Sequence, residues 1–384
     1  TVGGPLKING NNGILTGNLS AIECRNVLLN SGGTFTHNGV LTITGKSTLN
    51  DYAFEGAGTW TPATSQRTTF EGAAGTYHVK ANNWNAITIV ANAAAYYYFR
   101  AKSGLTMTWT AYLTLTTGNI YQNDDTNIFD VAGALLVSSG TFGLSTATGD
   151  LTCGSLTIAD GATFQATSGT TTLGGNFTDA GTFHHNNGTV MTPAGTAILL
   201  LGASNTAFYD IKSASTGSGV STFKQYTNKT VEHDMITGSK ELQWQLTTDN
   251  VTLTLGTDSY ASQIDADYLD GAVVANQYVY GASELYPAVF KSSIQYLRFM
   301  GHTGQEGYMS TNAHIKNVDV QKAITTPGDT KTLTLEGDCE FDAVTIAATD
   351  TLDLNGQRAE FGGDVTITGV NNNAGLIFAG GDWS

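Results

Sequence analysis

The stretch LTIADGATF at residues 156–164 decides the fold that this sequence predicts. An apolar-Thr-apolar triplet leads into a short Asp-Gly turn, and a second strand follows that ends on Phe164. The stretch VTIAATDTL at residues 344–352 has the same layout. Threonine favours strands because its branched Cβ packs on a pleated surface, and glycine supplies the positive φ of tight turns. Both stretches therefore predict a strand, a turn and a second strand.

Related units return at a nearly constant interval along the chain. Phe142, Phe164 and Phe183 each end a Gly-Thr-Phe or Ala-Thr-Phe unit, and the steps between them are almost equal. Leu135 and Leu156 each open an apolar strand, and a step of similar length separates them. A strand-turn-strand unit repeated at about 20 residues fits one coil of a parallel β-helix, in which each strand stacks on its equivalent in the next coil. Alternate apolar residues then face the interior of the coil.

The repeat predicts an all-β fold, a parallel β-helix or β-solenoid with an interrupting β-rich module. Tandem antiparallel β-sandwiches are the alternative, because they also have short strands with frequent turn signals. The stretch 283–300 has the bulk and charge of a short helix. The predicted organisation is a β-solenoid at 1–204 that is irregular and aromatic-rich at 51–130, a distinct β-rich module or insertion at 205–330, and further solenoid coils at 331–384.

The composition excludes several classes of protein. Of the 384 residues, 13% are charged and 40% are hydrophobic, which argues against intrinsic disorder. A net charge of −15 argues against nucleic-acid binding, because no basic surface would displace counterions from phosphates. No apolar stretch approaches the length of a transmembrane helix, so no membrane span is expected. Cys24, Cys153 and Cys339 lie far apart without a CxxC motif, and we expect them to be small buried apolar residues.

The best candidate metal ligands are Asp265, Asp267 and Asp270, in the stretch DADYLDG at 265–271. Oxygen ligands of this kind suit Ca²⁺, but the stretch lacks the bidentate Glu and the glycine spacing of an EF-hand loop. A Ca²⁺ site that stabilises the module and a solvated acidic loop are therefore both open. No other cofactor is expected, and no residue is assigned a catalytic role.

Other polar residues invite catalytic or metal-binding interpretations that the sequence does not support. His37, His184 and His185 stand at equivalent positions of two near copies, and we expect them to bond to neighbouring coils. The triplet EHD at 232–234 has no accompanying nucleophile motif such as GxSxG. The tyrosines at 96–98 cannot all face inward from one strand, so at least one is predicted to lie on the outside.

The two near copies carry a resemblance to a known class of repeat. GTFTHNG at 33–39 recurs as GTFHHNNGTV at 181–190, and TAFYDIK at 206–212 follows. Together they resemble β-solenoid repeats of environmental phage structural proteins and bacterial surface adhesins, in which a GTFTHNNGTV strand pair precedes a TFYNL strand. Asp210 replaces the usual Asn of that strand. The resemblance covers about a third of the chain and implies a large extracellular or virion-borne structural protein, without catalytic residues.

We therefore expect a non-enzymatic structural and adhesive protein of a phage virion surface, such as a tail or capsid fibre or a decoration protein. A bacterial cell-surface adhesin or secreted matrix protein is the first alternative, and a polysaccharide-degrading tailspike the second. The expected location is the virion surface, or otherwise the extracellular space or bacterial cell surface. Expected partners are other virion or surface chains, copies of this chain in a homo-oligomer such as a trimer, and a host surface glycan.

Overall fold

The computed structural model is an all-β solenoid of parallel strands. It describes residues 4–9, 13–17, 21–101, 106–122, 127–143, 148–202, 205–214 and 216–236, and beyond these the strands named below and Leu354. The described residues form no helix, and the described strand pairs are parallel, with coils about 22 residues apart. The predicted β-solenoid is confirmed and the antiparallel sandwich is wrong. The chain divides into two compact units, Thr1–Gly188 (unit 1) and Thr189–Ser384 (unit 2).

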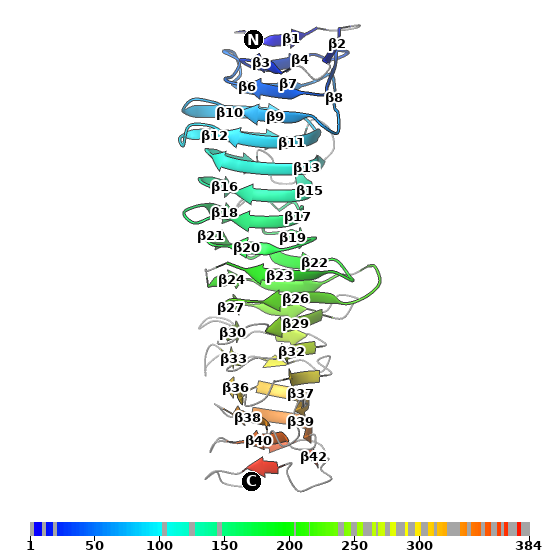
Figure 1. Ribbon diagram of the computed structural model, residues 1–384, viewed down its shortest axis with the longest axis vertical. Helices are drawn as coiled ribbons and strands as arrows, with labels where there is room; N and C mark the ends of the chain where they lie inside the picture. The colour runs from blue at the N-terminus through cyan, green and yellow to red at the C-terminus, as the bar shows by residue number, and fades with distance from the viewer. Residues whose placement is uncertain are drawn as a thin grey trace. The chain divides into compact units, whose positions relative to one another are not determined.

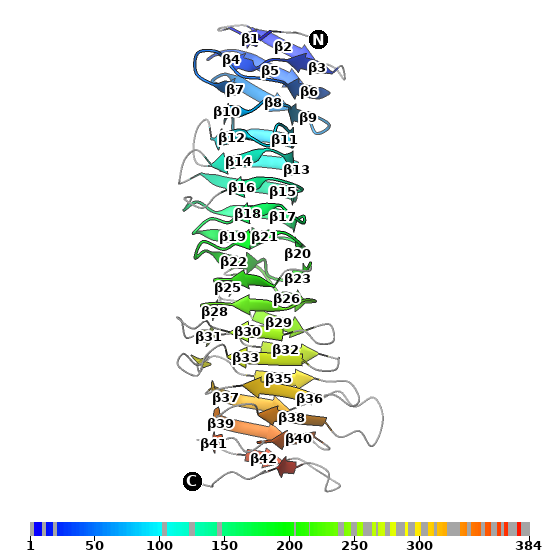
Figure 2. The same cartoon turned by 90° about the vertical axis from the view of Figure 1, so that its left-hand side faces the viewer.

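Each coil of unit 1 runs through three sides, and the first side is one continuous sheet of nine strands. Figures 1 and 2 show its strands one above another, in blue to green. In order along the sheet they are β1 (Leu6–Ile8), β4 (Val27–Leu29), β7 (Tyr52–Gly56), β10 (Gly75–Lys80), β12 (Ala95–Arg100), β14 (Asn119–Gln122), β16 (Thr141–Gly143), β18 (Thr163–Gln165) and β21 (Thr182–His184).

The second and third sides are separate in some coils and merge into one long strand in others. The short second-side strands are β2 (Ile14–Gly17), β5 (Thr34–His37), β8 (Thr59–Pro62) and β19 (Thr170–Leu173). The short third-side strands are β3 (Ile22–Cys24), β6 (Val40–Ile43), β9 (Arg67–Phe70) and β20 (Phe177–Asp179). Four long strands cover both sides: β11 (Asn83–Val90), β13 (Thr106–Thr117), β15 (Ile128–Val137) and β17 (Leu151–Ile158).

The core of unit 1 consists of columns of like side chains, because each strand pairs in register with its equivalent one coil away. Phe142 pairs with Phe164 and Phe164 with Phe183, so the repeat found in the sequence is the coil itself. The ring centroids of these neighbours are 5.2 and 5.9 Å apart and the rings are nearly parallel. On the second side, Phe35 pairs with Trp60 in the same way. Such columns bury apolar area from every coil.

Two buried asparagines join three successive coils each at the corners. The side-chain amide of Asn119 donates to the carbonyl oxygens of Ala93 and Ala95, and its side-chain oxygen accepts from the N–H of Thr141. Asn85 has the same arrangement at another corner, where its side-chain amide donates to the carbonyl oxygens of Thr64 and Gln66 and its oxygen accepts from Thr110 Oγ1. These amides donate to backbone carbonyl groups at the corners, where the strands begin and end.

Unit 2 repeats the cycle of three sides. Its first side is β24 (Thr206–Phe208), β27 (Lys229–Val231), β30 (Thr252–Leu255), β33 (Gln277–Gly281), β36 (Glu306–Ser310), β38 (Lys331–Leu335), β40 (Asp350–Asp353) and β43 (Gly375–Ile377). The second is β22 (Thr189–Thr192), β25 (Asp210–Ser213), β28 (Asp234–Ile236), β31 (Gln263–Asp265), β34 (Val289–Phe290) and β41 (Ala359–Phe361). The third is β23 (Ala197–Leu201), β26 (Ser221–Gln225), β29 (Leu242–Leu246), β32 (Tyr268–Ala272), β35 (Tyr296–Met300) and β42 (Val365–Ile367), while β37 (Ala313–Val320) and β39 (Cys339–Ile346) cover both.

Parallel pairing continues through the stretches that looked irregular in sequence. Strands β7 to β14 carry it through the aromatic-rich range 51–130, and β25 to β37 carry it through 205–330. The domain boundaries at 204 and 330 stay predictions. The short helix expected within 283–300 is wrong for the described part of that range, which consists of β34 and β35. Pro287 stands within that range and disfavours a helix.

Replacing Asn119 tests the role of the corner amides. We expect Asn119→Ala to lower the free energy of unfolding by about 3 kcal/mol, because three hydrogen bonds of about 1 kcal/mol each are lost and buried carbonyl groups lose a donor. The measurement is urea unfolding followed by tryptophan fluorescence, since Trp60, Trp84 and Trp109 lie in neighbouring coils of unit 1. Asn176→Ala is the control, because the Asn176 side chain is exposed. Equal effects of the two changes would contradict this role.

Substitutions at two turn glycines can distinguish the cost of backbone strain from the cost of steric contact between coils. Gly140 and Gly161 have φ of 82° and 74°, in the left-handed region. A Cβ at 140 would lie 1.9 Å from the carbonyl oxygen of Gly118, whereas a Cβ at 161 would meet no atom within 4 Å. Gly161→Ala should therefore cost only the conformational penalty of about 1–2 kcal/mol. We expect Gly140→Ala to lower the melting temperature clearly more, measured by circular dichroism, and equal shifts would contradict close contact.

Candidate functional site

A column of partly exposed rings runs along the outside of the first side of unit 1. Tyr52, His78, Tyr98 and Tyr121 come from β7, β10, β12 and β14, and they are register partners in successive coils. Their neighbouring ring centroids are 5.7, 5.7 and 5.6 Å apart. Tyr96, which is 39% exposed, stacks on Tyr121 at 6.0 Å. We call these five residues the outer aromatic column.

Strand alternation places these rings outside. In β12, Tyr97 is 1% exposed and points inward, whereas Tyr96 and Tyr98 on either side of it point outward. The expectation that the three tyrosines cannot all face inward is confirmed. Inside the coil, Tyr97 stacks on Tyr77 with ring centroids 4.7 Å apart. Burial raises the pKa of Tyr97, so its hydroxyl stays protonated and accepts a hydrogen bond from the N–H of Gly72.

The column ends beside a glycine that leaves room for the last ring. Gly143 is the register partner of Tyr121, and a Cβ at 143 would lie 2.5 Å from Tyr121 Cε1. The Tyr98 and Tyr121 rings are inclined by 25° with centroids 5.6 Å apart, which is an offset rather than a face-to-face arrangement. Part of each ring face is therefore not covered by its neighbour.

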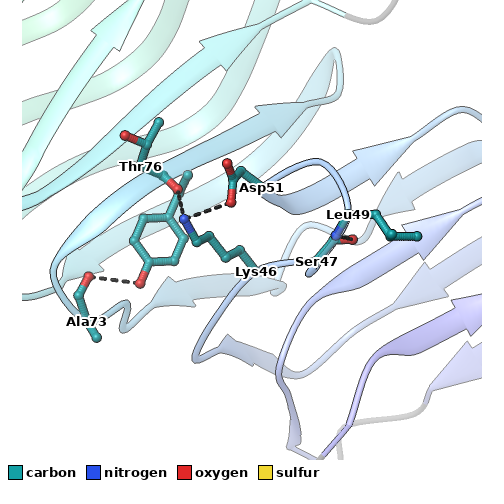
Figure 3. A network of polar contacts seen from close by, with 7 residues as sticks. Lys46, Ser47, Leu49, Asp51, Ala73 and Thr76 are labelled. Carbon is teal, nitrogen blue, oxygen red and sulfur yellow. Dashed lines mark hydrogen bonds and ion pairs between the residues drawn. The ribbon is translucent and has the colours of Figure 1, made fainter.

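A loop held by Lys46 protrudes next to the start of the column. Figure 3 shows Lys46 Nζ between two partners, 2.8 Å from Asp51 Oδ1 and 2.9 Å from the carbonyl oxygen of Thr76 in β10. The same ammonium group lies 5.4 Å from the centroid of the inward Tyr77 ring. Leu49 at the loop tip is 94% exposed. Lys46 thus fixes the loop at 44–51 to the following coil while an apolar side chain stands in solvent.

The ion pair changes the acidity of Asp51. The hydrogen bond from Lys46 holds the pKa of Asp51 below its usual value, with smaller contributions from the charges of Lys46 and His78. A carboxyl group whose pKa is lower in the folded state stabilises that state when it is ionised, and this contribution is lost as the pH falls through the lowered pKa. Both side chains are partly exposed, so the pair orders the loop more than it stabilises the unit.

Cys24 and Cys153 are free and buried, as the sequence predicted. Burial raises the pKa of both thiols to about 12, so they remain protonated near neutral pH and are poor nucleophiles. Cys339 lies in β39, in a part of the structure where side chains are not described. The two described cysteines are therefore part of the core rather than of a reactive site.

The histidines of the two near copies are not equivalent in the fold, contrary to the sequence-based expectation. His37 ends β5 on the second side and is fully buried, with Nε2 3.2 Å from the carbonyl oxygen of Val40. His184 ends β21 on the first side and is exposed, and His185 lies in the following turn, where its Nδ1 accepts from the N–H of Asn187. Each copy of the motif thus forms a strand followed by a turn, but the first copy lies on the second side of its coil and the second copy on the first side.

His233 of unit 2 has a carboxylate partner that its own triplet does not supply. Nδ1 of His233 lies 2.8 Å from Asp210 Oδ1, one coil earlier, and the imidazole stacks on Tyr209 with ring centroids 4.6 Å apart. The backbone N–H of His233 also donates to the carbonyl oxygen of Tyr209. These contacts join two coils at a corner. The sequence does not indicate this partner, because residues that are neighbours in successive coils lie far apart along the chain.

The structure does not show whether the predicted metal ligands lie close together, because it does not describe their side chains. Asp265 ends β31 and Asp270 lies within β32, but the structure describes only the backbone of these strands, and Asp267 lies outside the described residues. The Ca²⁺ site stays a prediction. In the part of the chain that the structure describes, no three His, Cys, Asp or Glu side chains are grouped so as to hold a metal ion.

A hollow of about 200 Å³ lies at the corner between the first and second sides of unit 1. None of the side chains that line it is acidic or basic. The lining residues are Gly56, Gly58, Thr59, Trp60, Ala81, Asn82 and Asn83.

Comparison with models of protein families, with curated proteins and with solved structures finds no match for this chain. Among the described residues, no helix is long and apolar enough to cross a membrane.

Removal of the Lys46 side-chain charge should free the loop at 44–51. We expect Lys46→Met to increase cleavage by pepsin at the exposed Leu49, because the ion pair and the bond to Thr76 are both lost. In the wild type, cleavage should rise steeply only in stronger acid, as Asp51 becomes protonated; in Lys46→Met it should already be fast at the upper end of pepsin's pH range. Mass spectrometry of the fragments measures both rates. Lys7→Met is the control, and parallel pH profiles for all three proteins would contradict the role of the pair.

Proposed function

We propose that this chain is a non-enzymatic structural and adhesive protein of an exposed surface, in the first place that of a phage virion. A tail or capsid fibre or a decoration protein are the corresponding components. The observation that carries the proposal is the outer aromatic column, displayed on a scaffold whose own aromatic core is sealed inside. Rings that remain half-exposed on a folded protein are typical of recognition surfaces.

The scaffold suits display because it is regular on the outside as well as the inside. On the third side, Thr42 pairs with Thr69, Thr69 with Thr88, and Thr88 with Thr114, so one outer row is threonine in four successive coils. Backbone N–H and C=O groups are used in the ladders between coils, and the side chains between them point alternately in and out. Such a surface can repeat one residue type at the spacing of the coils.

A polysaccharide-degrading spike has less support from the described carboxylates. Asp179 is 1% exposed, and its Oδ1 accepts a hydrogen bond from the N–H of Gly181 in the turn that follows. Asp160 is exposed in the turn before β18. A glycosidase needs two carboxyl groups facing one sugar linkage. Asp179 contributes to its own turn instead, as the side chains of aspartates in turns commonly do.

Localisation tests the proposal and separates its alternatives. Antibodies raised against the purified chain are used for immunogold electron microscopy of virions and of uninfected cells from the source culture. We expect gold on the virion surface. Gold on the surface of uninfected cells, or in the matrix around them, would select the bacterial adhesin or matrix protein instead. Label confined to cell interiors would contradict all of these locations. Release of reducing ends from capsule or lipopolysaccharide would contradict the non-enzymatic role.

A further inference from the structure

We propose that the outer aromatic column binds a polysaccharide chain of pyranose units that lies along the coil axis. This inference deepens the proposed adhesive function and rests on it. Its site is the row Tyr52, His78, Tyr98 and Tyr121 together with Tyr96, on the outside of β7, β10, β12 and β14.

The fold does not require rings at these positions. The same outward position of the first side holds Gly143, Gln165 and His184 in the next three coils, which also pair in register. The core rings of the first side, such as Phe142 and Phe164, have exposed fractions of 0%. The buried core rings therefore stabilise the stacked coils, whereas the outer aromatic column adds apolar area that is still exposed to solvent.

The arrangement of the rings favours an extended, repeating ligand. Each of four successive coils supplies one ring to the row, with Tyr96 as a second ring from β12. The centroid separations between successive coils in this row, 5.7, 5.7 and 5.6 Å, are nearly constant. A polymer that follows the column meets an equivalent ring at each step, at an interval close to one extended pyranose unit. A globular protein partner is better served by a broad apolar patch, whereas this site is a narrow row.

The chemistry of the rings matches that of a pyranose. A sugar ring presents patches of C–H groups that pack on an aromatic face, and hydroxyl groups at its rim that need hydrogen-bond partners. Tyr96, Tyr98 and Tyr121 provide faces and phenol hydroxyls together. Burial raises the pKa of Tyr121, and Tyr96 and Tyr98 make smaller contributions in the same direction. The Tyr121 hydroxyl therefore remains a hydrogen-bond donor in neutral solution. Lys80 lies on the same outer side of β10 as His78 and offers a cation to a uronate carboxylate.

Affinity electrophoresis tests the proposal with the whole chain. Native gels are cast with dextran or xylan, which are neutral, or with alginate or polygalacturonate, which are acidic. We expect retardation of the wild type by at least one of them, and a rise of the dissociation constant by roughly tenfold or more in Tyr98→Ala/Tyr121→Ala. If only the acidic polymers retard the protein, and Lys80→Ala weakens this retardation, the ligand is a uronate polymer. If a neutral polymer retards the protein, the ring contacts are sufficient for binding.

Matched variants make the result specific to the column. Tyr112→Ala removes a half-buried outward tyrosine from the third side of β13 and should bind as the wild type does. Tyr98→Phe/Tyr121→Phe keeps the rings, and should keep most of the binding even if the alanine variant unfolds. Absence of retardation by all four polymers, or binding unchanged in both double variants and in Tyr96→Ala, would overturn this site. Immunogold label on the virion would then still support a structural protein of the virion surface, so the two failures are distinguishable.

Discussion

Parallel hydrogen bonding in register between successive coils is the constraint on which the rest of unit 1 depends. It places each residue beside its equivalent one coil away. Side chains at equivalent positions therefore form columns along the coil axis. Inward phenylalanines become a stacked core, and a corner amide such as Asn119 becomes a link across three coils. Outward tyrosines become a row of rings on the surface. Core, corners and candidate site are thus consequences of one pairing rule.

The period of the coil was visible in the sequence only where the coils are short and uninterrupted. Phe142, Phe164 and Phe183 show it directly, because the turns between their strands vary little in length. In the coil after β4, Val27 pairs with Phe54, a longer step than those between the phenylalanines, because the Lys46 loop is inserted there. Loops at corners lengthen a coil without disturbing the stack, and they erase the regular period from the sequence.

The candidate site was harder to predict than the fold, for the same reason. Successive members of the outer aromatic column stand at unequal intervals along the chain, so no fixed period connects them. The available signal was an aromatic or His residue between two inward ones, as at Tyr98 between Tyr97 and Phe99. The near identity of the two GTF-containing copies was also misleading. His37 and His185 occupy the same place in the motif, but they lie on different sides of the solenoid. A short motif specifies a strand and a turn, but the stack decides which side it occupies.

The lengths of the strands also determine how unit 1 would carry a load. A pull along the coil axis passes through the junctions between coils in series, and at each junction the ladders of the three sides share the load. The ladder between β1 and β4 has three register pairs, whereas those between β10 and β12 and between β13 and β15 have six and seven. Among the ladders of the outer aromatic column, that between β10 and β12 has six register pairs, whereas that between β7 and β10 has three. Tension applied by a ligand bound at Tyr98 would therefore enter unit 1 beside a long ladder, whereas tension applied at Tyr52 would enter it beside a short one.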